Sequence, residues 1–207
     1  MGLFKNYVSH TRKPEGLLGK MMLSGMNSGH AKMADWGFSN LPFLTVNSAV
    51  DLGCGGGRNI GELLNRYPAA HVTGIDYSDL SVEKATEWNK DMIAAGRCSV
   101  MQGDVSHLHL APDTFDLATA FETIYFWPGL EKCFAQVANV LKLGGSFMIC
   151  NESDGTDAAS LKFEKIIDGM KNHTINEIST ALSKAGFSEI SSFHHKTKPW
   201  ITVIARK

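Results

Sequence analysis

Short apolar runs alternate with longer amphipathic segments along most of this 207-residue chain. Five alternations follow one another between about Ser48 and Gly186, a spacing typical of βαβ units with a largely parallel sheet. Two more apolar runs, at about 189–194 and 200–205, are joined by a tight loop that contains Pro199. Strands joined by a tight loop pair antiparallel. The sequence therefore predicts an α/β fold with a seven-stranded, mostly parallel sheet that ends in an antiparallel hairpin.

The pattern of apolar positions also gives approximate bounds for the elements. The first five strands are expected at Ser48–Leu52, His71–Ile75, Cys98–Gln102, Phe115–Ala120 and Ser146–Cys150. Helices are expected at Leu17–Asn27, Ser28–Trp36, Arg58–Tyr67, Ser78–Ala95, Leu130–Leu141 and between Thr174 and Gly186. Gly37 is expected to end the second helix, Gly144-Gly145 to precede the fifth strand, and Trp88 to lie in the core.

Charge and hydropathy exclude some classes of partner. The chain carries 20 Lys and Arg against 21 Asp and Glu, so a net charge of -1 gives no basic excess to grip nucleic acid. It has no apolar run near the ~18–20 residues that a membrane helix needs. We therefore expect neither a nucleic-acid nor a membrane partner. The expected assembly is a monomer or a homodimer.

Cysteine and histidine spacing gives no metal motif. The four cysteines have no Cys-x-x-Cys pair, which favours free thiols in a reduced, cytoplasmic protein; they are Cys54, Cys98, Cys133 and Cys150. His107-x-His109 and His194-His195 lack the i, i+4 spacing of a helical metal pair. No metal site is expected.

A dense glycine turn follows the first expected strand, in the segment VDLGCGGGRN. A glycine turn that opens a helix lets a ligand approach the backbone and directs amide N–H groups at an anion. The segment has no Lys-Ser/Thr pair, so it is not a nucleotide-triphosphate loop. Arg58 stands where a dinucleotide fingerprint needs its third glycine, so that fingerprint is broken.

The remaining spacing, Gly53-x-Gly55-x-Gly57 preceded by Asp51, resembles the first motif of class I S-adenosylmethionine-dependent methyltransferases. The resemblance extends over nearly the whole chain, from about Ser24 to Lys207. It implies a Rossmann-like three-layer αβα sandwich that binds S-adenosyl-L-methionine and releases S-adenosyl-L-homocysteine. It also implies that residues 1–44 form an N-terminal helical lid and residues 45–207 the cofactor-binding domain.

The resemblance assigns cofactor contacts along the chain. Its first motif supplies Asp51, Gly53, Cys54, Gly55 and Gly57. Asp76 corresponds to the acid that binds the ribose, and its two carboxylate oxygens suit two neighbouring hydroxyls. The remaining expected contacts are Tyr77 and Ser78 beside the adenosine, Asp104 and Val105 beside the adenine, Ala120 and Phe121 beside the methionine, and His30 and Asn27 at its carboxylate.

Two of the three candidate catalytic residues lie in the segment after the fourth strand. Glu122 is the first candidate for a base or an acceptor-orienting group, followed by Tyr125 in the same segment and by His173 further along the chain. Tyr125, Phe126 and Trp127 are expected to cover the acceptor site.

The segment after the fourth strand reads Ala-Phe-Glu-Thr rather than Asn/Asp-Pro-Pro-Tyr/Phe, which argues against methylation of base amino groups. A small-molecule acceptor is therefore favoured. Two alternatives stay open: a sensor or scaffold that binds the cofactor without catalysis, and an aminopropyl-type transferase on the same fold.

Overall fold

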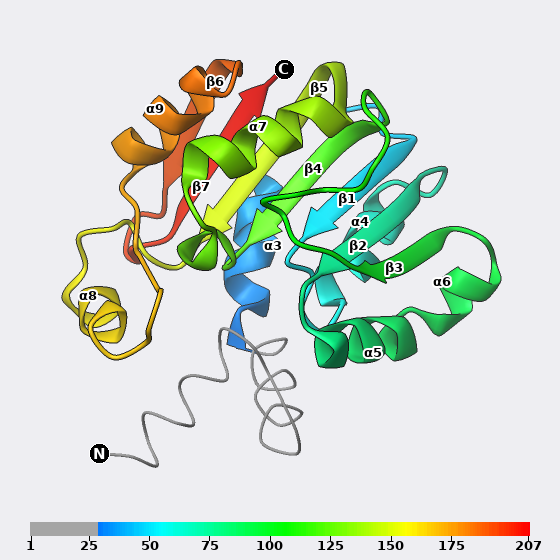
Figure 1. The fold of residues 1–207 in the computed structure, drawn as a ribbon, viewed down its shortest axis with the longest axis horizontal. Coiled ribbons are helices and arrows are strands. Elements are labelled where there is room, and N and C mark those ends of the chain that lie inside the picture. Colours follow the sequence, from blue (N-terminus) through cyan, green and yellow to red (C-terminus); the bar gives the residue numbers. More distant parts are fainter. Residues whose placement is uncertain (1–28) are drawn as a thin grey trace.

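The computed structural model describes residues 29–207 (Figure 1). The expected helix at 17–27 and the candidate contact Asn27 lie outside the described residues. Among the described residues, none of the helices is both long and apolar enough to cross a bilayer.

The sheet has seven strands in the order β3-β2-β1-β4-β5-β7-β6. The strands are β1 (Ser48–Leu52), β2 (His71–Asp76), β3 (Cys98–Gln102), β4 (Phe115–Phe121), β5 (Leu141–Asn151), β6 (Ser188–His194) and β7 (Ile201–Arg206). The pairs among β1 to β5 are parallel, and β7 lies antiparallel to both β5 and β6. The predicted mostly parallel sheet with an antiparallel terminal hairpin is confirmed.

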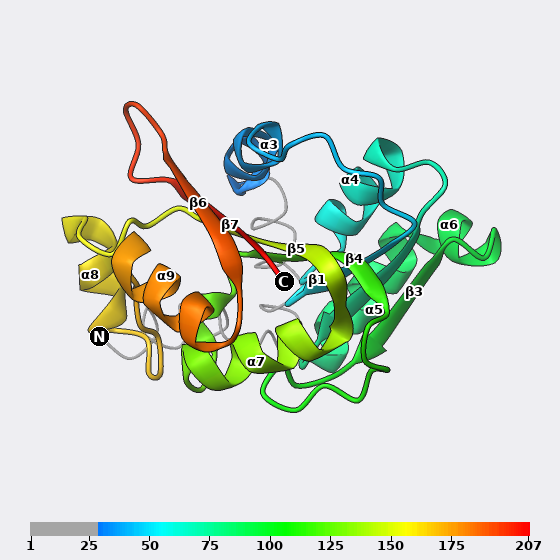
Figure 2. The same cartoon turned by 90° about the horizontal axis from the view of Figure 1, so that it is seen from above.

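Helices cover both faces of this sheet. They are α3 (Ala31–Ser39), α4 (Arg58–Arg66), α5 (Asp79–Trp88), α6 (Lys90–Ala94), α7 (Leu130–Val140), α8 (Ala158–Glu164) and α9 (Ile175–Lys184). Figure 2 shows α3 and α4 on one side of the sheet and α7 and α9 on the other. The three-layer sandwich predicted from the sequence is confirmed.

Two hydrophobic cores follow from this layering, because successive side chains of a strand point to opposite faces. On β4, Ala118 belongs to the core under α7 and α9, whereas its neighbour Leu117 belongs to the core under α3 and α4. The expected apolar face of α7 is buried, with Phe134 and Val137 fully inaccessible.

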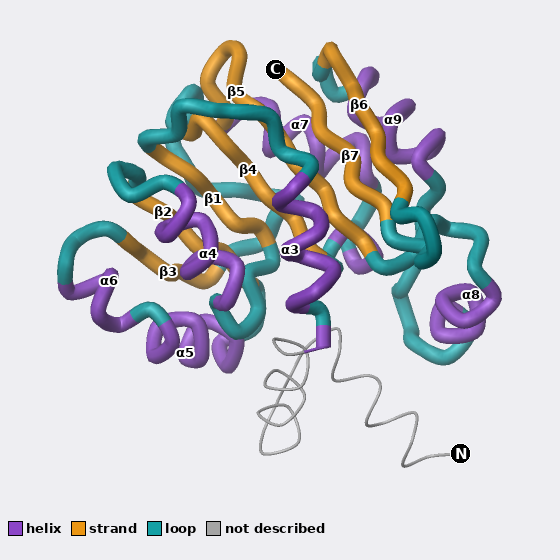
Figure 3. Tube along the Cα trace, turned by 180° about the vertical axis from the view of Figure 1, so that it is seen from behind, coloured by secondary structure: helices purple, strands orange, loops and turns teal. Residues whose placement is uncertain are grey.

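The helix α3 runs across the sheet face that also carries α4 (Figure 3). The expectation that Gly37 ends this helix is wrong: α3 continues to Ser39, and Asn40 is its C-cap. Gly37 is buried instead, and a Cβ at this position would overlap the Cys150 sulfur on β5. Close packing between α3 and the sheet thus explains the glycine at position 37, which does not end the helix.

The single long helix expected at 78–95 is two helices that meet at Asn89. The buried Asn89 amide donates to the backbone carbonyls of Gly57 and Ala85, both at 3.0 Å. Trp88 is 60% exposed and not a core residue, because the buried face of α5 carries Ser81 and Ala85. Asn89, at the break between the two helices, therefore links the end of α5 to the glycine turn through its side chain.

The glycine pair Gly144-Gly145 lies inside β5 rather than before it. The strand starts at Leu141, and its register with β4 shifts between the pairs Phe115–Leu141 and Leu117–Ser146. Gly144 has φ of +78°, so it accommodates this irregularity at little steric cost. The short helix α8 has no counterpart in the sequence prediction. The capping box predicted at Thr174 and Glu177 is confirmed as the start of α9.

The two helical glycines Gly37 and Gly61 give a matched test of packing. We expect Gly37→Ala to lower the free energy of unfolding by about 1–3 kcal/mol, because the added methyl group meets Cys150. At Gly61, on α4, a Cβ meets its nearest neighbour at 3.5 Å, and Gly61→Ala should be neutral or stabilising. Urea unfolding of both variants checks this, and equal effects would contradict the packing argument.

Candidate functional site

The turn after β1 is fastened to the end of β2. The N–H groups of Gly53 and Cys54 both donate to the Ile75 carbonyl, at 2.7 and 3.0 Å. The N–H of Gly55 donates to Oδ2 of Asp76 at 2.9 Å. The turn therefore has a fixed shape set by the neighbouring parallel strand.

Three glycines of the turn have positive φ, of +76° at Gly53, +52° at Gly55 and +81° at Gly57. A Cβ at Gly53 would overlap the Thr123 side chain, and one at Gly57 would lie 2.7 Å from the Cα of Ala85. At Gly55 nothing lies within 4 Å of that position. Two glycines thus permit close packing, while the middle one leaves backbone open to an approaching ligand.

Asp76 stands at the carboxyl end of β2 and is buried. Its Oδ1 accepts from the Ser78 N–H, and its Oδ2 from the Gly55 N–H, both at 2.9 Å. Burial raises the pKa of Asp76, and these backbone donors oppose the shift. Each carboxylate oxygen has further lone pairs to accept a ligand hydroxyl.

Asp51, by contrast, is directed into the sheet. It is 2% exposed, and the Thr119 hydroxyl on β4 donates to its Oδ1 at 2.7 Å. Burial raises the pKa of Asp51 to about 7, against the opposing hydrogen bond from Thr119, and the nearby Asp76 raises it further. Asp51 connects the two central strands beneath the turn.

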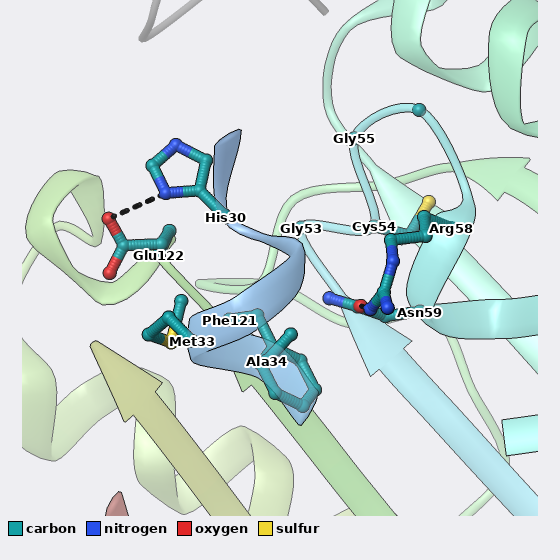
Figure 4. A pocket seen from close by; sticks show the side chains of 11 residues that line it. His30, Met33, Ala34, Gly53, Cys54, Gly55, Arg58, Asn59, Phe121 and Glu122 are labelled. Carbon is teal, nitrogen blue, oxygen red and sulfur yellow. Dashed lines mark hydrogen bonds and ion pairs between the residues drawn. The ribbon is translucent and has the colours of Figure 1, made fainter. Parts of the chain in front are cut away.

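A pocket of about 490 Å³, partly open to solvent, lies beside the turn (Figure 4). It brings together α3, the glycine turn and the end of β4. Its lining residues are His30, Met33, Ala34, Gly53, Cys54, Gly55, Gly56, Arg58, Asn59, Phe121 and Glu122. Burial raises the pKa of the Cys54 thiol well above its usual range, which agrees with a contact residue rather than a nucleophile.

Arg58, which excludes a dinucleotide fingerprint, connects two walls of this pocket. It is the first residue of α4, and its guanidinium lies 2.5 Å from the Asp35 carboxylate on α3. This ion pair joins α3 to α4, the helix that follows the glycine turn.

Glu122 follows β4 directly and has φ of +56°. Its Oε1 accepts from the Tyr125 hydroxyl at 2.9 Å and from the N–H of Glu152. Burial raises the pKa of Glu122 to about 7; His30 opposes this shift and Glu152 adds to it. The Tyr125 hydroxyl in turn accepts from the Ser153 N–H at 3.2 Å. Two candidate catalytic residues are therefore hydrogen-bonded to each other.

His30 lies opposite these carboxylates at the start of α3. Its Nδ1 is 3.7 Å from Oε2 of Glu122 and 3.4 Å from Oε1 of Glu152. Burial lowers the pKa of His30, but the two carboxylates outweigh this and raise it. The sequence analysis did not single out Glu152. Its signal was available, because β5 neighbours β4 and the carboxyl ends of parallel strands meet at one edge.

Several expected contacts are not part of the lining of this pocket. Ala120 is fully buried in the core on the α7 side, and Val105 is buried in the same core. Trp127 is partly buried and packs against that core, stacked on Phe147 with ring centroids 6.3 Å apart. The buried Ser78 caps α5.

Three more expected residues do not line the pocket. Tyr77 is 40% exposed, and the exposed Asp104 accepts from the Ser106 N–H within a turn. His173 is buried beside the start of α9 and does not line the pocket. Burial lowers the pKa of His173, as does Lys171.

Known proteins were compared with this chain. A family model described as a methyltransferase domain matches residues 49–145. A sterol 24-C-methyltransferase of Neurospora crassa is 26% identical over 172 residues, covering 75% of this chain and 44% of the relative. A sterol methyltransferase-like protein of Botryococcus braunii is 32% identical over 123 residues, covering 58% of this chain and 31% of the relative. The chain thus spans less than half the length of these relatives.

Solved structures share the fold. A Haloferax volcanii methyltransferase solved with the Trm112 methyltransferase activator superposes with a TM-score of 0.82 at 18% identity, covering 91% of this chain and 94% of that one. Geranyl diphosphate C-methyltransferase of Streptomyces coelicolor superposes with a TM-score of 0.70 at 12% identity, covering 85% and 77%.

The family match over residues 49–145 and the matched relatives make this chain similar to S-adenosylmethionine-dependent methyltransferases of class I. The solved structures show that it shares their fold. The cofactor of this class is S-adenosylmethionine.

The raised pKa of Asp51 predicts a pH-dependent stability. A carboxyl that ionises near pH 4 in the unfolded chain and about 7 in the folded one costs stability as pH rises through that window. Asp51→Asn should therefore gain stability relative to the wild type between pH 4 and pH 7, by up to about 4 kcal/mol. Chemical unfolding at several pH values measures this.

The exposed Asp91→Asn serves as the matched control and should show no such pH-dependent gain. If the stability difference between Asp51→Asn and the wild type stays constant across that pH range, the ionisation of Asp51 is not the cause.

Proposed function

We propose that this chain transfers a methyl group from S-adenosylmethionine to a small-molecule acceptor and releases S-adenosylhomocysteine. The observation that carries the proposal is the glycine turn: its Gly55 is open to a ligand and is hydrogen-bonded to Asp76, and the turn lines the same pocket as Glu122. The residues present therefore fit the cofactor. Bound there, it supplies an activated methyl group on a sulfonium centre.

The proposed cofactor contacts divide the site into two ends. Gly53, Cys54 and Gly55 line the pocket, while Gly57 packs the turn against Ala85 and Asp51 supports the turn through Thr119. Asp76 accepts from the ribose hydroxyls, with Tyr77, Ser78, Asp104 and Val105 towards the adenosine. His30 and Phe121 line the pocket end, with Ala120 in the strand behind. We propose residues 1–44 as a lid, of which α3 is the described part.

On the acceptor side, Glu122 and Tyr125 are the proposed working pair. The Tyr125 hydroxyl and the Glu152 N–H hold one oxygen of Glu122. The other oxygen, 3.7 Å from Nδ1 of His30, is the one that we propose to orient an acceptor or to take its proton. A pKa of about 7 suits proton transfer near neutral pH. Holding the acceptor in line with the methyl group accounts for much of the rate enhancement. His173 is a weaker candidate, since it does not line the pocket.

The acceptor class is proposed from relatives and charge. The names of two matched proteins refer to a sterol and to geranyl diphosphate, both small molecules. The net charge of -1 provides no general attraction for nucleic acid. The four free, buried cysteines fit a cytoplasmic location. The proposed assembly is a monomer or a homodimer.

The cofactor assignment is tested at Asp76. Asp76→Ala should weaken S-adenosylhomocysteine binding at least about tenfold, because hydrogen bonds to a charged group are lost. Isothermal titration calorimetry measures it, and circular dichroism checks the fold. The matched control is Asp79→Ala, three residues along on exposed α5 surface. Failure of the wild type to bind either form of the cofactor would refute the proposal.

The activity is tested by S-adenosylhomocysteine release with a panel of sterols, prenyl diphosphates and small hydroxylated and amino compounds. Glu122→Gln should lower kcat with the active acceptor by about 10²–10⁴-fold and leave cofactor binding nearly unchanged. The exposed Glu131→Gln is its control. Tight cofactor binding without turnover of any acceptor would favour the sensor or scaffold instead.

A further inference from the structure

Three side chains from distant parts of the sequence converge at the mouth of the pocket. His30 comes from the start of α3, Glu122 from the end of β4 and Glu152 from the end of β5. Ligand atoms of the three residues all lie within 4.8 Å of one another. We propose that His30, Glu122 and Glu152 bind a divalent metal ion.

The spacing of the ligand atoms fits a single ion. Nδ1 of His30 is 3.4 Å from one carboxylate and 3.7 Å from the other. Metal–ligand bonds of about 2.0–2.2 Å place neighbouring ligand atoms roughly 3–3.5 Å apart around one centre. Small side-chain rotations therefore bring all three atoms into a first coordination shell.

The second observation concerns the hydrogen bonding of Nδ1 of His30. Its Nδ1 is buried and has no hydrogen-bond partner, although two carboxylates lie nearby. A buried polar atom without a hydrogen bond is costly, and a metal ion between His30 and the two carboxylates would supply its partner. Figure 4 shows the ring of His30 directed at the neighbouring Glu122 carboxylate. A cation between them would use the lone pair of Nδ1 and neutralise both acids.

The groups behind the ligands resemble the outer shell of a metal site. One oxygen of Glu122 is held by the Tyr125 hydroxyl and the Glu152 N–H, which leaves Oε2 facing His30. The Tyr125 hydroxyl is itself held by the Ser153 N–H. Such supports fix the orientation of a ligating carboxylate and are part of metal affinity.

One imidazole and two carboxylates form a mixed N/O donor set. Oxygen donors favour Mg²⁺ and Mn²⁺, whereas imidazole favours the later transition metals, so Mn²⁺ lies between the two preferences. Three protein ligands leave coordination positions free on the pocket side, where an oxygen ligand can bind. The inference goes beyond the proposed methyl transfer, because metal binding and cofactor binding can be measured separately.

The experiment titrates MnCl₂ into the full chain after dialysis against EDTA and follows free Mn²⁺ by electron paramagnetic resonance. We expect saturable binding at one site per chain. His30→Ala and Glu152→Gln should each weaken it at least about tenfold, and Tyr125→Phe by about tenfold. His71→Ala and Glu131→Gln remove the same groups from exposed positions and should leave binding unchanged.

Titration with S-adenosylhomocysteine is run in parallel on every variant. Retained cofactor binding in Glu152→Gln shows that the variant is folded, so a loss of Mn²⁺ binding is then local. Absence of saturable Mn²⁺ binding to a wild type that binds the cofactor overturns the metal site and leaves the proposed function standing. Mn²⁺ binding that all three site variants retain overturns it as well.

Discussion

Two backbone hydrogen bonds to the Ile75 carbonyl hold the arrangement on which the rest of the site depends. They fix the turn after β1 against the end of β2, so that Gly55 and Asp76 meet. Because β1 and β2 are neighbours in a parallel sheet, their carboxyl ends lie at the same edge. The register of five residue pairs therefore sets the shape of the turn more strictly than the glycines could alone.

Buried acids are the second constraint. Asp51 and Glu122 both have pKa values raised to about 7, mainly because burial penalises the charged form. Asp51 has a hydroxyl partner and links strands, whereas Glu122 faces a pocket with a histidine and a second acid. The same burial effect on the pKa therefore acts on an acid that links two strands and on an acid that lines a pocket. The two acids differ in their neighbours, because Glu122 lies beside His30, whose Nδ1 makes no hydrogen bond.

Most of the fold could be predicted from the sequence, because hydrophobic periodicity reports strands and helices directly. The errors share one cause, which is that glycine and apolar residues have several uses. Gly37 looked like a terminator but packs against Cys150, and Gly144 lies within a strand at a register shift. Trp88 looked like a core residue but is exposed, because the buried face of α5 carries Ser81 and Ala85.

The site, like the fold, could be predicted from the sequence only in part. The sequence by itself determined the parallel sheet, the glycine turn and the acid at the end of β2, because these depend on local pattern and on neighbouring strands. Only the tertiary structure decided that His30, Glu122 and Glu152 meet, since they come from three separate segments. It also placed Ala120 in the core and packed the partly buried Trp127 against it. Local periodicity gives the direction of a strand, but contacts between distant segments depend on how the layers pack.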